Sequence, residues 1–225
     1  ENGLGIYIDV AVVDGDGIPV SGGTVDTEDG GVINLSATGS IVIEGVIGQN
    51  SGDVTDDSLG RAKVANININ SLSNNVQLKR KVEGRDQVTI FGNVINVFNN
   101  AHVYATGQDG ILYMAAREQL FMAPNTLPLS DPDRNAPIAL GRKLVHLSAP
   151  TLEVRGDVLL TYLGNDSNGA TPVQPPSDGS TGLALMTAEE SLVFSGKVIS
   201  DGDIRLIAGL DLTTTISNQR REDID

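Results

Sequence analysis

The chain has no cysteine and no tryptophan, and aromatic residues make up only 4% of its 225 residues. Without cysteine it has neither a disulfide framework nor a thiolate metal site. With so few aromatic side chains, the apolar interior must come from Val, Ile, Leu and Ala, which suit a narrow, regularly stacked core. No apolar run reaches the length of a membrane-spanning helix, so we expect no membrane insertion.

Basic residues are also scarce, because 15 Lys and Arg stand against 29 Asp and Glu and give a formal net charge of −14. Binding to a phosphate backbone needs clustered cations, so nucleic acid is not an expected partner. Anionic membrane surfaces are disfavoured for the same reason. The charge either attracts divalent cations and basic surfaces or keeps a β-rich surface soluble.

Hydrophobic residues make up 40% of the chain, too large a share for a disordered segment. The first residues, Glu1-Asn2-Gly3-Leu4, form neither an initiator methionine nor a signal peptide, so we expect a chain processed or excised from a longer one. We expect three parts: residues 1–30 as an N-terminal capping segment or an exchanged strand, residues 31–217 as a repeat region, and residues 218–225 as a polar tail.

A degenerate internal repeat runs through the middle part. Around Ala37, apolar residues stand two positions before (Leu35), four after (Ile41) and six after (Ile43). Each copy contains two short alternating segments, which is typical of strands. Such a strand finds backbone partners most simply by stacking on the preceding copy. The further copies are centred on Ser71, Asn99, Ala116, Ala149, Ala188 and Ala208, with a one-residue slip at Ser71 and Ala149.

The shortest spacings between these centres indicate a coil of roughly 20 residues. We interpret the longer spacings as coils with insertions, at residues 49–60, 79–87, 124–141 and 164–181. Three of these, 49–60, 124–141 and 164–181, follow the second strand of a coil and are expected along one edge. The predicted fold is all-β, a single-stranded parallel β-helix (β-solenoid) of about eight coils with loop insertions. The segment 183–193 has good helix formers, but it fits the repeat and is predicted as strand.

Two stretches carry a resemblance to a known family. Residues 31–41, Gly-Val-Ile-Asn-Leu-Ser-Ala-Thr-Gly-Ser-Ile, and residues 200–209, Ser-Asp-Gly-Asp-Ile-Arg-Leu-Ile-Ala-Gly, resemble the repeats of filamentous-haemagglutinin-type bacterial surface adhesins. The resemblance covers most of residues 30–215 as a repeat style. It implies a right-handed coil with three short faces, an extracellular or cell-surface location, and a role in attachment or as a stalk.

One short motif suggests a cation. Asp14-Gly15-Asp16-Gly17 is similar to the start of a calcium loop, where closely spaced oxygens flank a glycine turn. Asp14 and Asp16 are the candidate calcium ligands, and calcium is the one cofactor considered. The stretch lacks the third ligand pair and the distal bidentate Glu, and a β-turn explains it equally well.

Enzymatic chemistry has little support in the sequence. Polysaccharide cleavage needs two carboxyl groups that flank one sugar bond, and nothing in the spacing brings two of them together. No nucleophile arrangement, phosphate loop or dinucleotide fingerprint stands out, so we do not expect an enzyme. In the repeat frame His102 and His146 both point outward, as ordinary solvated side chains. The candidate carboxylates are Asp86, Asp109, Glu118 and Asp157.

Three functions therefore remain open at this point. The first is an extracellular structural or adhesive module that contacts a host or other extracellular surface ligand. The second is a subunit that assembles with itself into a filament by end-to-end stacking of coils, since the ends of such a fold are open sheet edges. The third is a β-helix enzyme acting on polysaccharide.

Overall fold

The computed structural model describes residues 4–8, 12–13, 19–21, 24–25, 30–48, 64–124, 126, 138–160, 176–200 and 202–214. Throughout these ranges the chain is all-β, with strands that are mostly parallel and no helix. The same ranges accordingly contain no helix that is long and apolar enough to cross a membrane. The predicted all-β class and the parallel pairing are confirmed.

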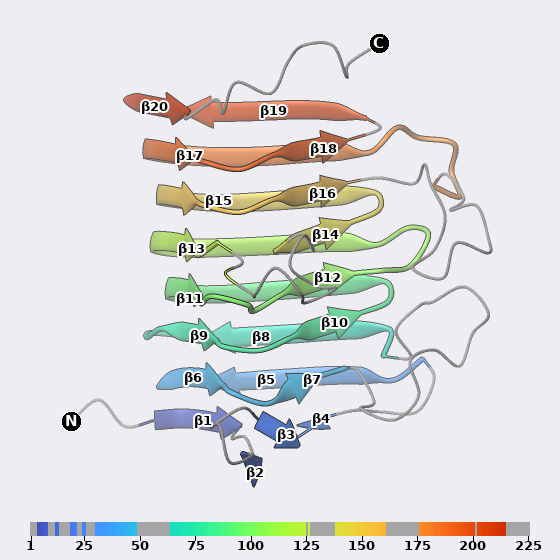
Figure 1. Cartoon of the computed structure of the whole chain (residues 1–225), viewed down its shortest axis with the longest axis vertical. Coiled ribbons are helices and arrows are strands. Elements are labelled where there is room, and N and C mark those ends of the chain that lie inside the picture. Colours follow the sequence, from blue (N-terminus) through green and yellow to red (C-terminus); the bar gives the residue numbers. More distant parts are fainter. Residues whose placement is uncertain are drawn as a thin grey trace.

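Most strands belong to two sheets (Figure 1). A hairpin of β2 (Val12–Val13) and β3 (Pro19–Ser21) is antiparallel and separate. The larger sheet has eleven strands: β1 (Leu4–Ile8), β5 (Val32–Ala37), β6 (Ser40–Ile43), β8 (Asn66–Ser71), β9 (Val76–Leu78), β11 (Gln87–Val97), β13 (Ile111–Met122), β15 (Leu144–Val154), β17 (Leu183–Phe194), β19 (Asp203–Ala208) and β20 (Asp211–Thr214). The smaller sheet has seven: β4 (Thr24–Val25), β7 (Val46–Ile47), β10 (Val82–Gly84), β12 (Val103–Ala105), β14 (Ala139–Gly141), β16 (Val158–Leu160) and β18 (Val198–Ser200).

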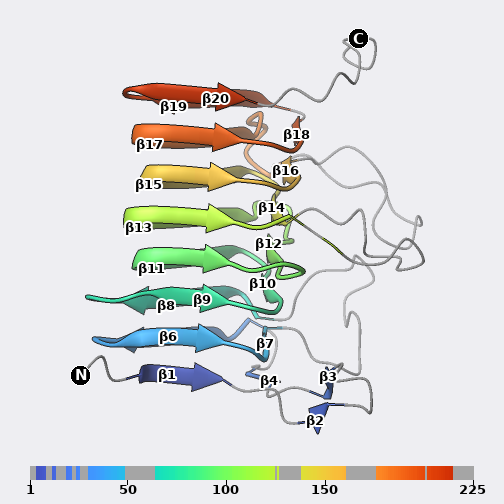
Figure 2. The same cartoon turned by 60° about the vertical axis from the view of Figure 1, so that its left-hand side comes forward.

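The chain alternates between the two sheets, and each passage lies beside the previous one. Ile67 of β8 lies opposite Val88 of β11, and Val88 lies opposite Leu112 of β13. Figure 1 and Figure 2 show the result as layers stacked along the long axis, from β1 at one end to β19 and β20 at the other. The short strands of the smaller sheet lie one above another along one side of this stack.

The long strands bend in the middle. In β11 the register shifts between Gly92 and Val94, and in β15 it shifts between Ala149 and Thr151. Elsewhere the two halves are separate strands, such as β5 and β6, or β19 and β20. Each layer therefore presents three wall segments around one interior, namely the two halves of the long strand and the short strand.

The interior is a column of aliphatic side chains. In the strands β8, β13, β15 and β17 alternate residues point inward and are buried. Their burial in register means that each layer covers the one below it, which is the source of most of the fold's hydrophobic stabilisation. Fully buried members include Ile41, Ile67, Ile90, Leu112, Leu120, Leu147 and Val154.

Much of the predicted repeat is correct in detail. Ala37 lies opposite Ser71, and Ala149 lies opposite Ala188, which in turn lies opposite Ala208. Residues 183–193 lie in β17 and are strand, as predicted. The predicted slip at Ala149 is real, because it falls at the bend where the register shifts.

The copy centred on Asn99 is wrong. The residue of β11 that lies opposite Ala116 is Gly92, so the true repeat begins seven residues earlier. Val103 and Ala105, assigned to the second half of a long strand, form β12 in the smaller sheet. The predicted copy therefore paired the second half of β11 with β12 instead of pairing the two halves of β11. This error arises because a short apolar alternation looks the same in every strand of a layer.

Two further expectations about insertions are corrected. Residues 79–87 are not an inserted loop, since they contain β10 and continue the smaller sheet. The segments after residues 48 and 160 follow β7 and β16, the short third strand, whereas the predicted insertion 124–141 follows the long strand β13 and ends in the strand β14. The expectation that three insertions follow the second strand is therefore wrong for two of them.

The predicted N-terminal part is in contact with the repeats. β1 pairs in parallel with β6, and β4 pairs in parallel with β7. Both main sheets thus extend into residues 1–30, whose role as a cap or exchanged strand stays a prediction. The polar tail, residues 218–225, lies outside the described residues.

Candidate functional site

The predicted calcium ligands, Asp14 and Asp16, lie outside the described residues, so that prediction stays open. In the part of the chain that the structure describes, no three His, Asp or Glu side chains come together in a group that could hold a metal ion.

The four candidate carboxylates are each engaged separately. Asp86 pairs with its neighbour Arg85 at 3.2 Å, and Glu118 accepts a hydrogen bond from the Asn93 amide at 2.7 Å. Asp157 accepts one from the backbone N–H of Lys197 at 2.9 Å. Asp109 belongs to the network described next.

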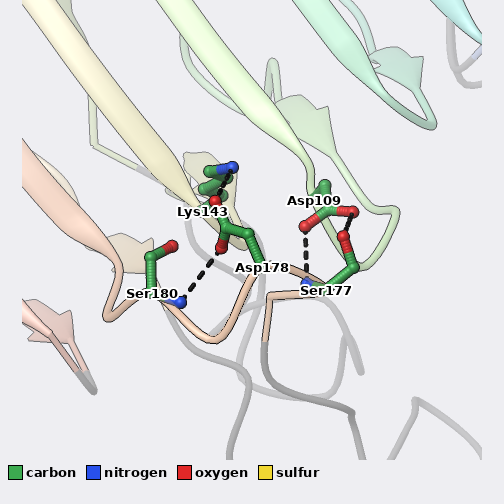
Figure 3. A network of polar contacts seen from close by, with 5 residues as sticks. All are labelled: Asp109, Lys143, Ser177, Asp178 and Ser180. Carbon is green, nitrogen blue, oxygen red and sulfur yellow. Dashed lines mark hydrogen bonds and ion pairs between the residues drawn. The ribbon is translucent and has the colours of Figure 1, made fainter.

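The most developed polar network links three turns of the stack (Figure 3). Asp109, before β13, accepts hydrogen bonds from the backbone N–H of Ser177 at 2.8 Å and from its hydroxyl at 2.5 Å. Lys143, before β15, forms an ion pair with Asp178 at 2.6 Å. Asp178 also accepts a hydrogen bond from the Ser180 N–H at 3.0 Å. The turn before β17 is thereby fixed to the turns of the two preceding layers.

The charges of this network are fixed by its hydrogen bonds. The Ser177 hydroxyl and N–H hold the pKa of Asp109 below its ordinary value, and the Lys143 ammonium holds the pKa of Asp178 well below it. The hydrogen bond to Asp178 raises the pKa of Lys143. General acid–base catalysis is most effective when the pKa of the catalytic group lies near the working pH, and these shifts move all three pKa values away from neutrality. We therefore interpret the network as structural.

A second polar cluster covers the outer side of the smaller sheet. Lys81 forms an ion pair with Glu83 at 2.8 Å, and its ammonium lies 5.6 Å from the centre of the Tyr104 ring. The Tyr104 hydroxyl lies 3.1 Å from Nδ1 of His102. Glu83 and His102 are buried, so the prediction that His102 is an ordinary solvated side chain is wrong. The Asn99 copy correctly placed Val103 and Ala105 inward, so the error lies elsewhere: alternation along the strand does not reveal contacts such as the one between His102 and Tyr104.

His146, in contrast, is on the outer face of the larger sheet. Its ring meets Tyr113 edge to face with centroids 4.8 Å apart, and Tyr113 in turn lies 5.4 Å from Phe91. Partial burial lowers the pKa of the His146 imidazole. Three rings from β11, β13 and β15 thus form an uncharged aromatic row across three layers, which the sequence pattern does not predict.

This aromatic row can be recognised from the sequence only after the pairing register of the strands is known. Phe91, Tyr113 and His146 are separated by unequal numbers of residues, because the loops between layers differ in length. Comparison with known proteins adds no assignment to this geometry: no protein-family model, no curated protein and no solved structure matches the chain.

Proposed function

We propose that this chain is a segment of an extracellular, right-handed β-solenoid rod that serves as a stalk or an attachment module at a cell surface. The observation that carries the proposal is the repeated parallel register, in which each layer is covered by the next over a continuous aliphatic column. Stacks of this kind resist bending because every layer is fixed to its neighbours by backbone hydrogen bonds and by packing.

Two further observations support a mechanical role. The polar network of Asp109, Lys143 and Asp178 joins the turn before β17 to the turns of the two preceding layers. The strongly acidic composition favours solubility of a long β-rich surface. The handedness, the surface location and the adhesive role rest on the resemblance of the repeats to filamentous-haemagglutinin-type adhesins.

Negative-stain imaging of the purified chain, with small-angle X-ray scattering on the same sample, tests the rod. With about eight layers at about 4.8 Å spacing, the particle should be a rod on the order of 40 Å long. The measurement should be repeated with and without calcium, to include the Asp14 and Asp16 prediction. A compact, nearly spherical particle in both conditions would refute the proposal.

A filament subunit is the second candidate, and one observation favours it. The last described layer exposes apolar side chains, with Ile204 of the inward row 47% exposed and Leu210 80% exposed. Unpaired strand edges beside open apolar surface promote end-to-end pairing. If two ends pair, the same images show long uniform filaments, and an Ile204→Lys change in the end layer shortens them. A monomeric chain at high concentration excludes this second function.

A further inference from the structure

A small hollow lies on the outer face of the larger sheet, at the bend of β8, β11 and β13. It has a volume of about 270 Å³, and its walls include Leu72, Phe91 and Arg117. Three outward residues are stacked in register across it: Asn70 on β8 lies opposite Phe91 on β11, and Phe91 lies opposite Ala115 on β13. Ala115 contributes only a methyl group to the wall of the hollow beside Phe91.

The apolar wall of the hollow is accessible. Phe91 is 38% exposed and Leu72 is 44% exposed, and both line the same hollow. Exposed large apolar side chains that meet in a concave place are more informative than single ones scattered over a surface. The volume is slightly below the ~300–1,000 Å³ range of pockets for drug-sized molecules, so it fits one small ring.

The Phe91 ring packs against a second ring, that of Tyr113, which does not line the hollow. Tyr113 lies against it at 5.4 Å between centroids, and His146 lies against Tyr113 at 4.8 Å. Because burial lowers the pKa of His146, the row next to Phe91 carries no charge at neutral pH. A ring that is already oriented loses little conformational entropy when a ligand stacks on it.

The hollow is lined by polar side chains that can donate hydrogen bonds. Arg117 reaches from β13 across β11 and donates a hydrogen bond from Nη1 to the carbonyl oxygen of Leu72, which fixes the guanidinium at the rim. A guanidinium has five N–H donors, so others remain beyond this bond. The side chain of Asn70 adds an amide, which both donates and accepts.

We propose that this hollow is a binding site for a single neutral sugar ring, such as one hexose unit of a glycan. A pyranose has an apolar face of C–H groups that packs on an aromatic ring, here Phe91. Its hydroxyl groups both accept and donate, which matches the guanidinium of Arg117 and the amide of Asn70. The formal net charge of −14 repels acidic sugars at long range and has no effect on neutral ones.

This inference names a ligand for the proposed attachment module and rests on that function for its biological setting. The two are separable by experiment. A protein that images as a short rod but binds no sugar is a stalk without this site. A protein that binds sugar at Phe91 but is not a rod retains the site and loses the proposed architecture.

The test is a titration of isotope-labelled protein by nuclear magnetic resonance. The probes are methyl β-glucoside, methyl β-galactoside and N-acetylglucosamine, with methyl glucuronide as an acidic comparison. We expect saturable shifts of the Asn70 side-chain amide and the Arg117 Nε–H with at least one neutral probe, at millimolar concentration, and weaker binding of the glucuronide at low salt. Absence of saturable shifts with all three neutral probes overturns the proposal, as does tighter binding of the glucuronide.

Matched variants locate the binding. Phe91→Ala should weaken binding at least about tenfold, the expected effect of losing one stacking ring. Phe98→Ala is the control, because Phe98 is similarly exposed at 39% and lies outside the hollow. Arg117→Gln, which keeps a donor but removes the charged fork, should weaken binding less than Phe91→Ala. Equal binding by parent and Phe91→Ala proteins, with matching circular dichroism, contradicts the assignment.

Discussion

The ammonium of Lys143 lies 2.6 Å from the carboxylate of Asp178, and this contact joins turns that belong to successive layers of the stack. Lys143 directly precedes β15, and Asp178 lies in the turn before β17. Together with the hydrogen bonds from Ser177 to Asp109, the contact determines where the chain re-joins the stack after the segment that follows β16. Its energetic role is measurable through its pH dependence.

Asp178→Asn should lower the melting temperature at pH 7, and the difference from the parent should disappear in acid. The native pKa of Asp178 lies well below its ordinary value, because of the hydrogen bond from Lys143. A carboxyl group whose pKa is lowered by folding stabilises the protein fully above its unfolded pKa, about 3.9, and loses that contribution as the pH falls toward the native pKa. Thermal melts from about pH 7 to about pH 2 follow this change.

Asp203→Asn is the control for that experiment. Asp203 forms an exposed ion pair with Arg205 at 3.2 Å, but both residues lie on β19 and the pair joins no separate layers. Ion pairs of that kind contribute little to stability. If the two substitutions give the same pH profile, the Lys143–Asp178 contact has no special role in fixing the turn.

His146→Gln should remove a loss of stability near pH 6. Burial against the sheet lowers the pKa of His146, so the unfolded chain binds its proton more readily than the folded one. Stability from this group is therefore complete above the unfolded pKa, about 6.5, and decreases as the pH falls through that value. Chemical denaturation at about pH 7.5 and about pH 5 should show a smaller decrease for the variant than for the parent. An identical decrease in both proteins would assign the pH dependence to other groups.

Gly48→Ala should be much more destabilising than Gly30→Ala. Both glycines have a positive φ, +83° and +78°, so both substitutions introduce the same backbone strain of about 1 kcal/mol. At Gly48 the added Cβ would also lie 2.1 Å from the Glu83 carbonyl oxygen in the next layer, whereas at Gly30 nothing lies within 4 Å. Urea denaturation of both variants measures their unfolding free energies, and the difference between them isolates the steric clash at Gly48 from the backbone strain that both share. Equal losses of unfolding free energy would mean that the layers containing β7 and β10 can move apart at little cost.

Leu120→Ala should cost about 2–5 kcal/mol of unfolding free energy, the usual range for a fully buried leucine. Leu120 is fully buried and lies opposite Ile95 in one layer and Leu152 in the other, so the cavity would open between three layers. Leu210→Ala is the matched change on the surface, where Leu210 is 80% exposed and a difference within about 0.5 kcal/mol is expected. Similar losses at both positions would show that the inward row does not carry the stability.

The long strands were predictable because their alternation extends over enough residues to be recognised. Residues 183–193 show this: they include good helix formers, but their period-2 pattern predicts a strand, and they lie in β17. The smaller sheet was not recognised among the repeats because its strands are two or three residues long. A strand such as Val103–Ala105 contains a single alternation, which fits any wall of the layer equally well.

The site residues were less accessible to sequence reasoning, for a geometric reason. Neighbours on the outer face, such as Phe91 and Tyr113, come from different layers, and unequal loops separate them in the chain. Only the register places them together. The burial of His102 was misjudged although Val103 and Ala105 face inward as the repeat required, because alternation along the strand does not reveal that the Tyr104 hydroxyl lies 3.1 Å from the His102 ring.

The inward residues of β5 and β19 are the same, with Ile33, Leu35 and Ala37 in the layer next to β1 and Ile204, Leu206 and Ala208 in the last described layer. A gene rearrangement that removes or duplicates one whole repeat therefore joins surfaces that already match. Duplication or deletion of a repeat can thus lengthen or shorten such a chain by one layer without requiring a new core. The connections between layers can meanwhile change in sequence and length without altering the inward rows.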